Sequence, residues 1–229
     1  MKSLITAIAC TLFLISFGAR AELVSVIQEA SGQADAEATI TISEVPGDPW
    51  AVDISIEVPE IPSVFVADIR GFFFNFPIEA ALPGVVITGP DVTYWDTKIA
   101  PETDFTGFSG DVNLNGGGGL EGFPELFNVG VEIGNPGLRG GRDDIQQTTF
   151  RFSIGQAYQQ YVPGGSISPA IFEGSPLALR VTSLGEDREG SSKLMCFGDC
   201  FTETEIPAPA PLLLVAAGMF ALRRRFRRA

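Results

Sequence analysis

Residues 52–58 read Val-Asp-Ile-Ser-Ile-Glu-Val, and every second side chain in this stretch is apolar. A β-strand points successive side chains to opposite faces, so this alternation predicts a strand with one buried face and one wet face. The same pattern returns, on even or on odd positions, at 38–43, 127–133, 150–154 and 177–181. The chain therefore carries at least five segments that favour the half-buried strands of an antiparallel sheet.

A further stretch, residues 64–76, is mostly apolar and contains Phe72, Phe73, Phe74 and Phe76. This composition is typical of a strand covered on both faces. No helical stripe is visible between residues 22 and 202, and turn-forming Gly and Pro lie between the strands at 46–49, 83–84, 89–90, 135–137 and 163–165. We therefore predict an all-β fold, an antiparallel β-sandwich or jelly roll, over residues 22–202.

The N-terminal segment has the composition of a secretory signal peptide. Lys2 precedes an apolar stretch that ends on Ala19-Arg20-Ala21, with small residues at the two positions that a signal peptidase reads. We predict a signal helix over residues 1–21, cleavage after Ala21 and an exported mature chain that begins at Glu22.

The C-terminal segment, residues 203–229, has three parts in a fixed order. A proline motif comes first, an apolar run over residues 212–222 follows, and an arginine cluster ends the chain. As a helix the apolar run would rise only roughly 16 Å, against roughly 30 Å of hydrocarbon. Taken from Ile206, the segment predicts a marginal transmembrane span. The arginines predict that this end stays on the cytoplasmic side and that the preceding domain faces outward.

This order resembles the PEP-CTERM sorting signal, which exosortase systems of Gram-negative bacteria recognise. The resemblance covers about 24 of 229 residues, and Ala208 replaces the acidic residue of the family's motif, as in Pro- and Ala-rich variants. A plain C-terminal membrane anchor is the alternative. The residues concerned are Ile206, Pro207, Ala208 and Pro209 in the motif, Leu212, Leu213, Leu214, Val215 and Leu222 in the apolar run, and Arg223, Arg224, Arg225, Arg227 and Arg228 in the charge stop.

The resemblance implies sorting by an exosortase-like membrane protease, a transient or permanent membrane anchor, and delivery to the cell surface or to extracellular polysaccharide. Residues 68–74 and 188–193 are also similar to stretches of other uncharacterised exosortase-type substrates. That similarity implies no activity.

The charge and the residue composition exclude several classes of function for the region between the two ends. All 28 acidic residues lie between Glu22 and Glu205 against eight basic ones, a net charge of −20, which argues against nucleic-acid binding because that needs a basic face. The chain has no histidine, so His-activated nucleophiles and His-ligated metals are excluded. Carboxylate-pair chemistry, as in a glycan hydrolase, stays open.

Two cysteines, Cys196 and Cys200, remain after the predicted signal. Export to an oxidising compartment and the intervening Gly198 predict a local disulfide near the last strand.

A calcium loop is the one metal site that the sequence suggests. Oxygen-bearing side chains stand at relative positions one, three and five, a glycine stands at six, and an acid follows at eleven: Asp111, Asn113, Asn115, Gly116 and Glu121. An EF-hand needs its glutamate at position twelve, so we keep a looser calcium loop beside the alternative of an Asn-Gly hairpin turn. A cation held jointly by Asp143, Asp144 and Glu186 is a further hypothesis.

The sequence thus predicts an exported, non-enzymatic surface or matrix protein. The alternatives are a calcium- or carbohydrate-binding module and a carboxylate-based glycan hydrolase. No cofactor other than calcium is expected.

Overall fold

The computed structural model describes residues 22–32, 36–59, 67–99, 127–135, 144–184 and 188–203, which belong to one unit, Ala21–Thr204. The strands are β1 (Glu22–Gly32), β2 (Glu37–Glu44), β3 (Ala51–Glu57), β4 (Asp68–Phe74), β5 (Val85–Thr88), β6 (Val92–Thr97), β7 (Val129–Ile133), β8 (Gln147–Ile154), β9 (Leu177–Leu184), β10 (Gly190–Cys196) and β11 (Thr202–Glu203). Four short 3-10 helices accompany them: η1 (Glu79–Gly84), η2 (Gln156–Tyr161), η3 (Pro163–Gly165) and η4 (Pro169–Phe172).

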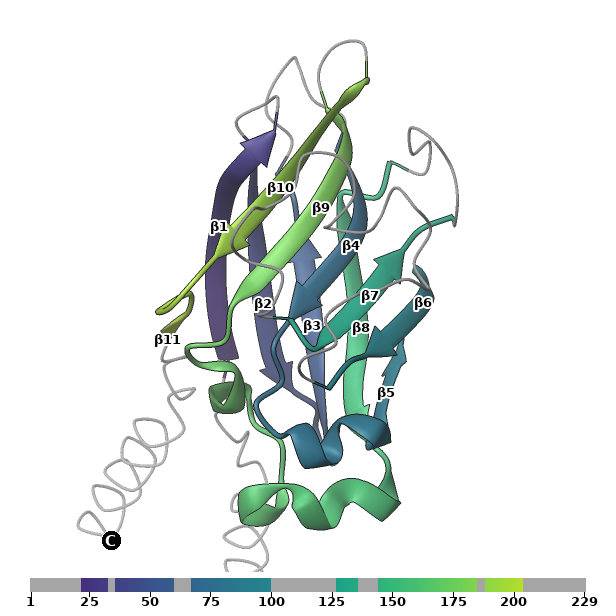
Figure 1. Cartoon of the computed structure of the whole chain (residues 1–229), viewed down its shortest axis with the longest axis vertical. Helices are drawn as coiled ribbons and strands as arrows, with labels where there is room; N and C mark the ends of the chain where they lie inside the picture. Colours follow the sequence, from purple (N-terminus) through teal and green to yellow (C-terminus); the bar gives the residue numbers. More distant parts are fainter. Residues whose placement is uncertain are drawn as a thin grey trace, which may run out of the picture. The chain divides into compact units, whose positions relative to one another are not determined.

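The strands follow a single hydrogen-bonded order, β5-β8-β3-β2-β1-β10-β9-β4-β7-β6, and β11 adds to β1. Every strand pair among the described residues is antiparallel. Figure 1 shows that this order folds back on itself, with a front layer of β10, β9, β4, β7 and β6 and a back layer of β2, β3, β8 and β5. The strand β1 pairs with both β2 and β10 and so joins the layers. The all-β antiparallel prediction is confirmed, and the two layers fit a sandwich.

The core between the layers is rich in phenylalanine rings. Phe72 of β4 lies 6.1 Å from Phe150 of β8, and Phe74 lies 5.7 Å from Phe152, measured between ring centroids. All four side chains are buried. Burial of large aromatic side chains dominates the energetics of such cores, so this ring cluster is the main apolar contact between the two layers.

The two layers differ in what covers their outer faces. The back strands β2 and β8 alternate buried and accessible positions, as predicted. In the front layer β4 is buried throughout, as predicted, but β7 is buried throughout as well, and β9 nearly so. The prediction of a wet face at 127–133 and 177–181 was therefore wrong at Gly130, Glu132 and Ala178, which are buried, whereas Asn128 and Arg180 stay partly exposed. One covering group is Phe127, whose ring lies 6.4 Å from Phe73.

The short helices were also missed by the sequence reasoning. Two of the predicted turns, 83–84 and 163–165, lie inside η1 and η3. A 3-10 helix of three to six residues is too short to show a helical period of apolar side chains, so periodicity could not find it.

The antiparallel register places the strand termini at two opposite ends of the domain. We call the end that contains the start of β1 the basal end; it also holds the termini Glu44, Ala51, Phe74, Ile154, Leu177 and Cys196. The opposite, apical end holds Glu37, Glu57, Asp68, Ile133, Gln147 and Gly190. The 3-10 helices η1, η2 and η3 lie at the basal end (Figure 1).

Candidate functional site

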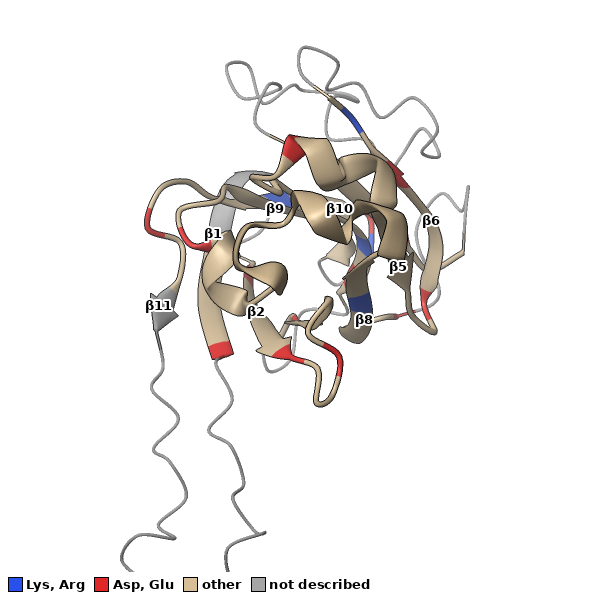
Figure 2. Cartoon of the chain, turned by 90° about the horizontal axis from the view of Figure 1, so that it is seen from below, with Lys and Arg blue, Asp and Glu red and all other residues tan. Residues whose placement is uncertain are grey.

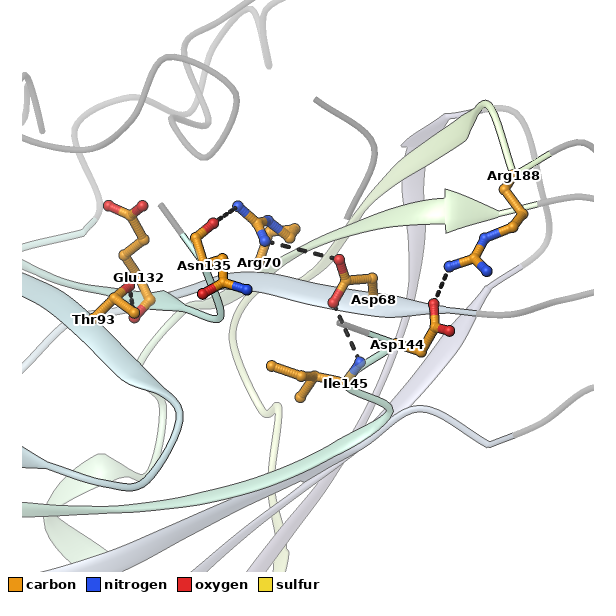
Figure 3. A network of polar contacts seen from close by, with 8 residues as sticks. All are labelled: Asp68, Arg70, Thr93, Glu132, Asn135, Asp144, Ile145 and Arg188. Atoms are coloured by element: carbon orange, nitrogen blue, oxygen red, sulfur yellow. Dashed lines mark hydrogen bonds and ion pairs between the residues drawn. The ribbon is translucent and has the colours of Figure 1, made fainter. Parts of the chain in front are cut away.

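A network of polar contacts at the apical end centres on Arg70 (Figure 3). Arg70 stands at a bulge, because the pairing of β4 with β9 skips from Ile69 to Gly71. Its side chain is only 2% exposed. One guanidinium nitrogen, Nη2, donates a hydrogen bond of 2.7 Å to the backbone oxygen of Asn135, just after β7. The other, Nη1, lies 3.8 Å from Oδ2 of Asp68.

Asp68 joins this network to the segment that precedes β8. Its Oδ1 accepts a hydrogen bond of 3.3 Å from the backbone N–H of Ile145, while the N–H of Ile69 donates to the carbonyl of Ile145 at 2.8 Å. Asp68 is fully buried. A bulge commonly re-aims a side chain, and here it lets two charged residues occupy the start of a strand that is otherwise core. The network therefore connects β4 with the loops after β7 and before β8.

A second ion pair lies nearer the surface at the same end. Asp144, just before β8, is bonded to Arg188, just before β10, and both side chains are more than a third exposed. Both residues have a positive φ, 51° and 60°. Asp144, one of the three residues of the predicted shared cation site, therefore has an arginine partner. The other two residues of that site are Asp143 and Glu186. Those two residues lie outside the described part of the chain.

A row of charged residues crosses the front layer below this network. Register places Glu132 of β7 opposite Gly71, Gly71 opposite Arg180 of β9, and Arg180 opposite Lys193 of β10. Glu132 and Lys193 are each 2% exposed. Burial, followed by the neighbouring positive charge of Arg180, lowers the pKa of Lys193 below its usual value.

These positions concentrate the basic residues of an acidic domain. Of the six Lys and Arg residues in the described ranges, four lie on β4, β9 or β10 or immediately before β10: Arg70, Arg180, Arg188 and Lys193. Two of the carboxylates nearby have arginine partners: Asp68 pairs with Arg70 and also accepts from the N–H of Ile145, and Asp144 pairs with Arg188. These ion pairs and hydrogen bonds hold the apical strand ends and loops together.

Sequence reasoning found only part of this network. Asp68 and Arg70 are charged residues within a segment whose composition predicts a fully buried strand. That contrast was the signal in the sequence for a buried polar network. The backbone partners at Asn135 and Ile145 are 65 and 77 residues from Arg70 and Asp68. Such distant partners leave no periodic trace. Burial of Glu132 and Lys193 was not foreseen, because each stands in an alternating or polar stretch.

The basal end holds the one predicted covalent feature that falls among the described residues. Cys196 and Cys200 form a disulfide with their Cα atoms 5.5 Å apart, which confirms the predicted pair. Gly198 between them has a φ of +80°, a left-handed conformation that glycine adopts without steric cost. The disulfide closes the turn between β10 and β11.

The strand β11 then pairs with the start of β1. Its two residues, Thr202 and Glu203, lie opposite Val24 and Leu23. The first residues after the predicted signal peptide and the last residues before the predicted tail are therefore neighbours on one sheet. Both ends of the described domain leave from its basal end (Figure 1).

Several predicted features lie outside the described residues. They are the signal peptide at 1–21, the sorting motif Ile206–Ala208 with Pro209, the apolar run, the arginine cluster, and the calcium candidates Asp111, Asn113, Asn115 and Glu121. Among the residues that are described, no group of three or more His, Cys, Asp or Glu side chains is placed to hold a metal ion. Within the same ranges no helix is both long and apolar enough to cross a membrane.

Comparison of the chain with models of protein families, with curated proteins and with solved structures found no match.

Proposed function

We propose that this chain is an exported, non-enzymatic protein of the cell surface or extracellular matrix, delivered by its C-terminal tail to an exosortase-like membrane protease. The observation that carries the proposal is the order of proline motif, short apolar run and arginine cluster over residues 206–228. A weak apolar span held by terminal positive charge suits a temporary anchor that is later replaced by another attachment.

Two features of the domain support this proposal. The pairing of β11 with β1 and the disulfide between Cys196 and Cys200 hold the strand end from which the tail departs. Only Thr204 and Glu205 separate the last strand residue from Ile206 of the motif. A protease that recognises the motif would therefore act on residues that follow, within a few positions of the sequence, a strand paired with β1. A structural or adhesive role among extracellular polysaccharides fits the acidic, two-layered β domain.

The proposal is tested by blocking recognition of the motif in cells that produce the protein. In a Pro207→Ala/Pro209→Ala variant we expect export to continue, but the loss of mass that accompanies removal of the tail should disappear. A Pro211→Ala variant is the matched control, because it removes a proline outside the four-residue motif. Mass spectrometry of membrane and surface fractions reads the outcome. Equal processing of all three proteins, or a mature wild-type protein that still carries residues 212–228, would overturn the proposal.

A calcium- or carbohydrate-binding module is the second candidate. The spacing of Asp111, Asn113, Asn115 and Gly116 favours it, since calcium loops supply oxygen ligands at alternating positions followed by a glycine. Calorimetry and thermal unfolding should then show binding heat and a raised melting temperature with calcium. An Asp111→Asn/Glu121→Gln variant should show neither. Absence of both effects in the wild-type protein, with calcium and with glycans, removes this candidate.

A further inference from the structure

One segment at the basal end carries no charged side chain. Residues 155–172, which run through η2, η3 and η4, contain no Asp, Glu, Lys or Arg, although the region between Glu22 and Glu205 has a net charge of −20. We call this segment the basal cap. Its exposed residues include Gln156, Gln160, Tyr161, Pro163, Ser166 and Ala170.

The basal cap packs against η1. The N–H of Gly155 donates a hydrogen bond of 2.7 Å to the carbonyl of Gly84, and Tyr158 packs so closely on Gly84 that a Cβ atom there would lie 2.4 Å from the tyrosine side chain. Two side chains of the cap itself, Val162 and Phe172, are buried. Tyr161, whose ring centroid is 6.2 Å from that of Tyr158, remains 48% exposed. The cap therefore presents a neutral surface with an outward tyrosine on a fixed backbone.

The cap lies at the end of the domain from which the chain continues into the predicted tail. Ile167 of the cap donates a backbone hydrogen bond of 2.7 Å to Pro49, in the turn between β2 and β3, and β2 pairs with β1, whose first residues pair with β11. Two residues separate Glu203 from the proline motif. The three Cα–Cα steps from Glu203 to Ile206 span at most about 11 Å in a fully extended chain. A motif read at the membrane surface would thus keep the basal end close to that surface.

We propose that the basal cap rests on the phospholipid headgroup layer while the C-terminal apolar run is anchored. This inference rests on the proposed function, because it needs the tail to engage a membrane. Tyrosine is favoured at the membrane interface because its ring is apolar and its hydroxyl can hydrogen-bond to headgroups and water. Glutamine and serine side chains and the absence of charge let the surface approach lipid without burying an ion.

Acidic residues border the cap and decide which headgroup charge it can approach. Asp48 lies in the adjoining turn and Glu173 follows η4 directly. Figure 2, which views the domain from below, shows the acidic positions around ribbon segments that carry neither sign of charge. Negative charge at this margin is repelled by anionic headgroups, so contact is expected to be shallow and to favour uncharged lipid.

The test uses the exported chain with its tail intact, reconstituted in phosphatidylcholine vesicles. Two matched variants, Gln160→Cys in the cap and Gln147→Cys at the apical end, both replace an exposed glutamine and each carries one nitroxide label. Collision with a water-soluble nickel chelate and with oxygen measures whether the label contacts lipid. Flotation of the vesicles separately measures whether the tail holds the protein to the membrane.

We expect the label at residue 160 to lose access to the nickel chelate on vesicles, while the label at residue 147 keeps it. Adding Tyr161→Glu, or replacing half of the lipid by phosphatidylglycerol, should restore access at residue 160 without abolishing flotation. If the protein floats and both labels are equally open to the chelate, the basal cap does not face lipid, and the proposed function still stands. If the protein fails to float, the membrane tail is refuted, and the inference fails with it.

Discussion

Removing the carboxylate of Asp68 tests whether the apical network stabilises the fold. The variant Asp68→Ala takes away the negative charge 3.8 Å from Arg70 and the acceptor for the N–H of Ile145. Arg70 is 2% exposed, so its charge would stay buried with less compensation. Breaking one side of a buried ion pair costs about 3–5 kcal/mol. We expect about 3 kcal/mol, at the lower end, because Arg70 keeps its hydrogen bond to the carbonyl of Asn135.

An exposed pair on the back layer provides the matched control. Asp53 of β3 accepts two hydrogen bonds, of 2.9 and 3.1 Å, from Arg151 of β8, and these side chains are 32% and 45% exposed. Water screens such pairs, which contribute about 0–1 kcal/mol. Both pairs join an aspartate to an arginine, but the exposed pair is directly hydrogen-bonded, whereas the nearest charged atoms of the buried pair are 3.8 Å apart. Asp53→Ala is therefore expected to lower the free energy of unfolding by no more than about 1 kcal/mol.

Urea unfolding, monitored by fluorescence, measures the loss in free energy of unfolding for both variants. The m-values of the variants and the wild-type protein should agree. For a domain of this size, the Asp68→Ala variant should also melt about 6–12 °C lower, since about 1 kcal/mol shifts the melting temperature by 2–4 °C. Equal losses at Asp68 and Asp53 would refute the reasoning, because burial would then not decide the cost. A loss near zero at Asp68 would show that the network does not stabilise the apical end.

Three further predictions follow from the core, the disulfide and the charged row. Phe152→Ala should lower the free energy of unfolding by about 3–5 kcal/mol, because the ring of Phe152 contacts three other buried rings. Chemical denaturation measures this loss. A loss below about 1 kcal/mol would contradict the claim that these rings form the core. Cys196→Ser/Cys200→Ser should cost only about 2 kcal/mol, since the loop that the disulfide closes is short, and a cost above 4 kcal/mol would show a larger role. The pKa of Lys193 is lower in the folded protein, so the unfolded chain binds more protons at pH values between the folded and unfolded pKa. The free energy of unfolding should therefore rise with pH through that window, and Lys193→Met should remove this rise. If urea unfolding at a series of pH values gives the same slope for the variant and the wild-type protein, the burial of the ammonium group is contradicted.

The sequence predicted those strands in which buried and solvent-facing positions alternate residue by residue. In β2 and β8 one face meets the core and the other meets water, so the residues record the geometry directly. The strand β7 shows the limit of this reasoning. Gly130 and Glu132 appear as the wet positions of an alternating segment, yet both are buried, because the front layer is covered on its outer side too. Alternation records the character of the side chains and not what covers them.

The apical network could be predicted only as a set of unexplained charges. Asp68 and Arg70 stand out in an apolar strand, but their partners Asn135 and Ile145 supply backbone atoms, which any residue could supply. The bulge at Arg70 had one residue signal, Gly71, because a glycine inside a strand often marks a bulge. The disulfide was predictable because its two cysteines are four residues apart, so that the chain itself brings them together.

The central claim, that this is an exported protein whose tail directs processing, is tested most directly by mass spectrometry of the mature protein from the cells that make it. The account predicts an N-terminus at Glu22, a closed bond between Cys196 and Cys200, and a C-terminus that lacks the apolar run at 212–222 and the arginine cluster. A mature surface protein that retains Arg223–Arg225 in full would contradict it.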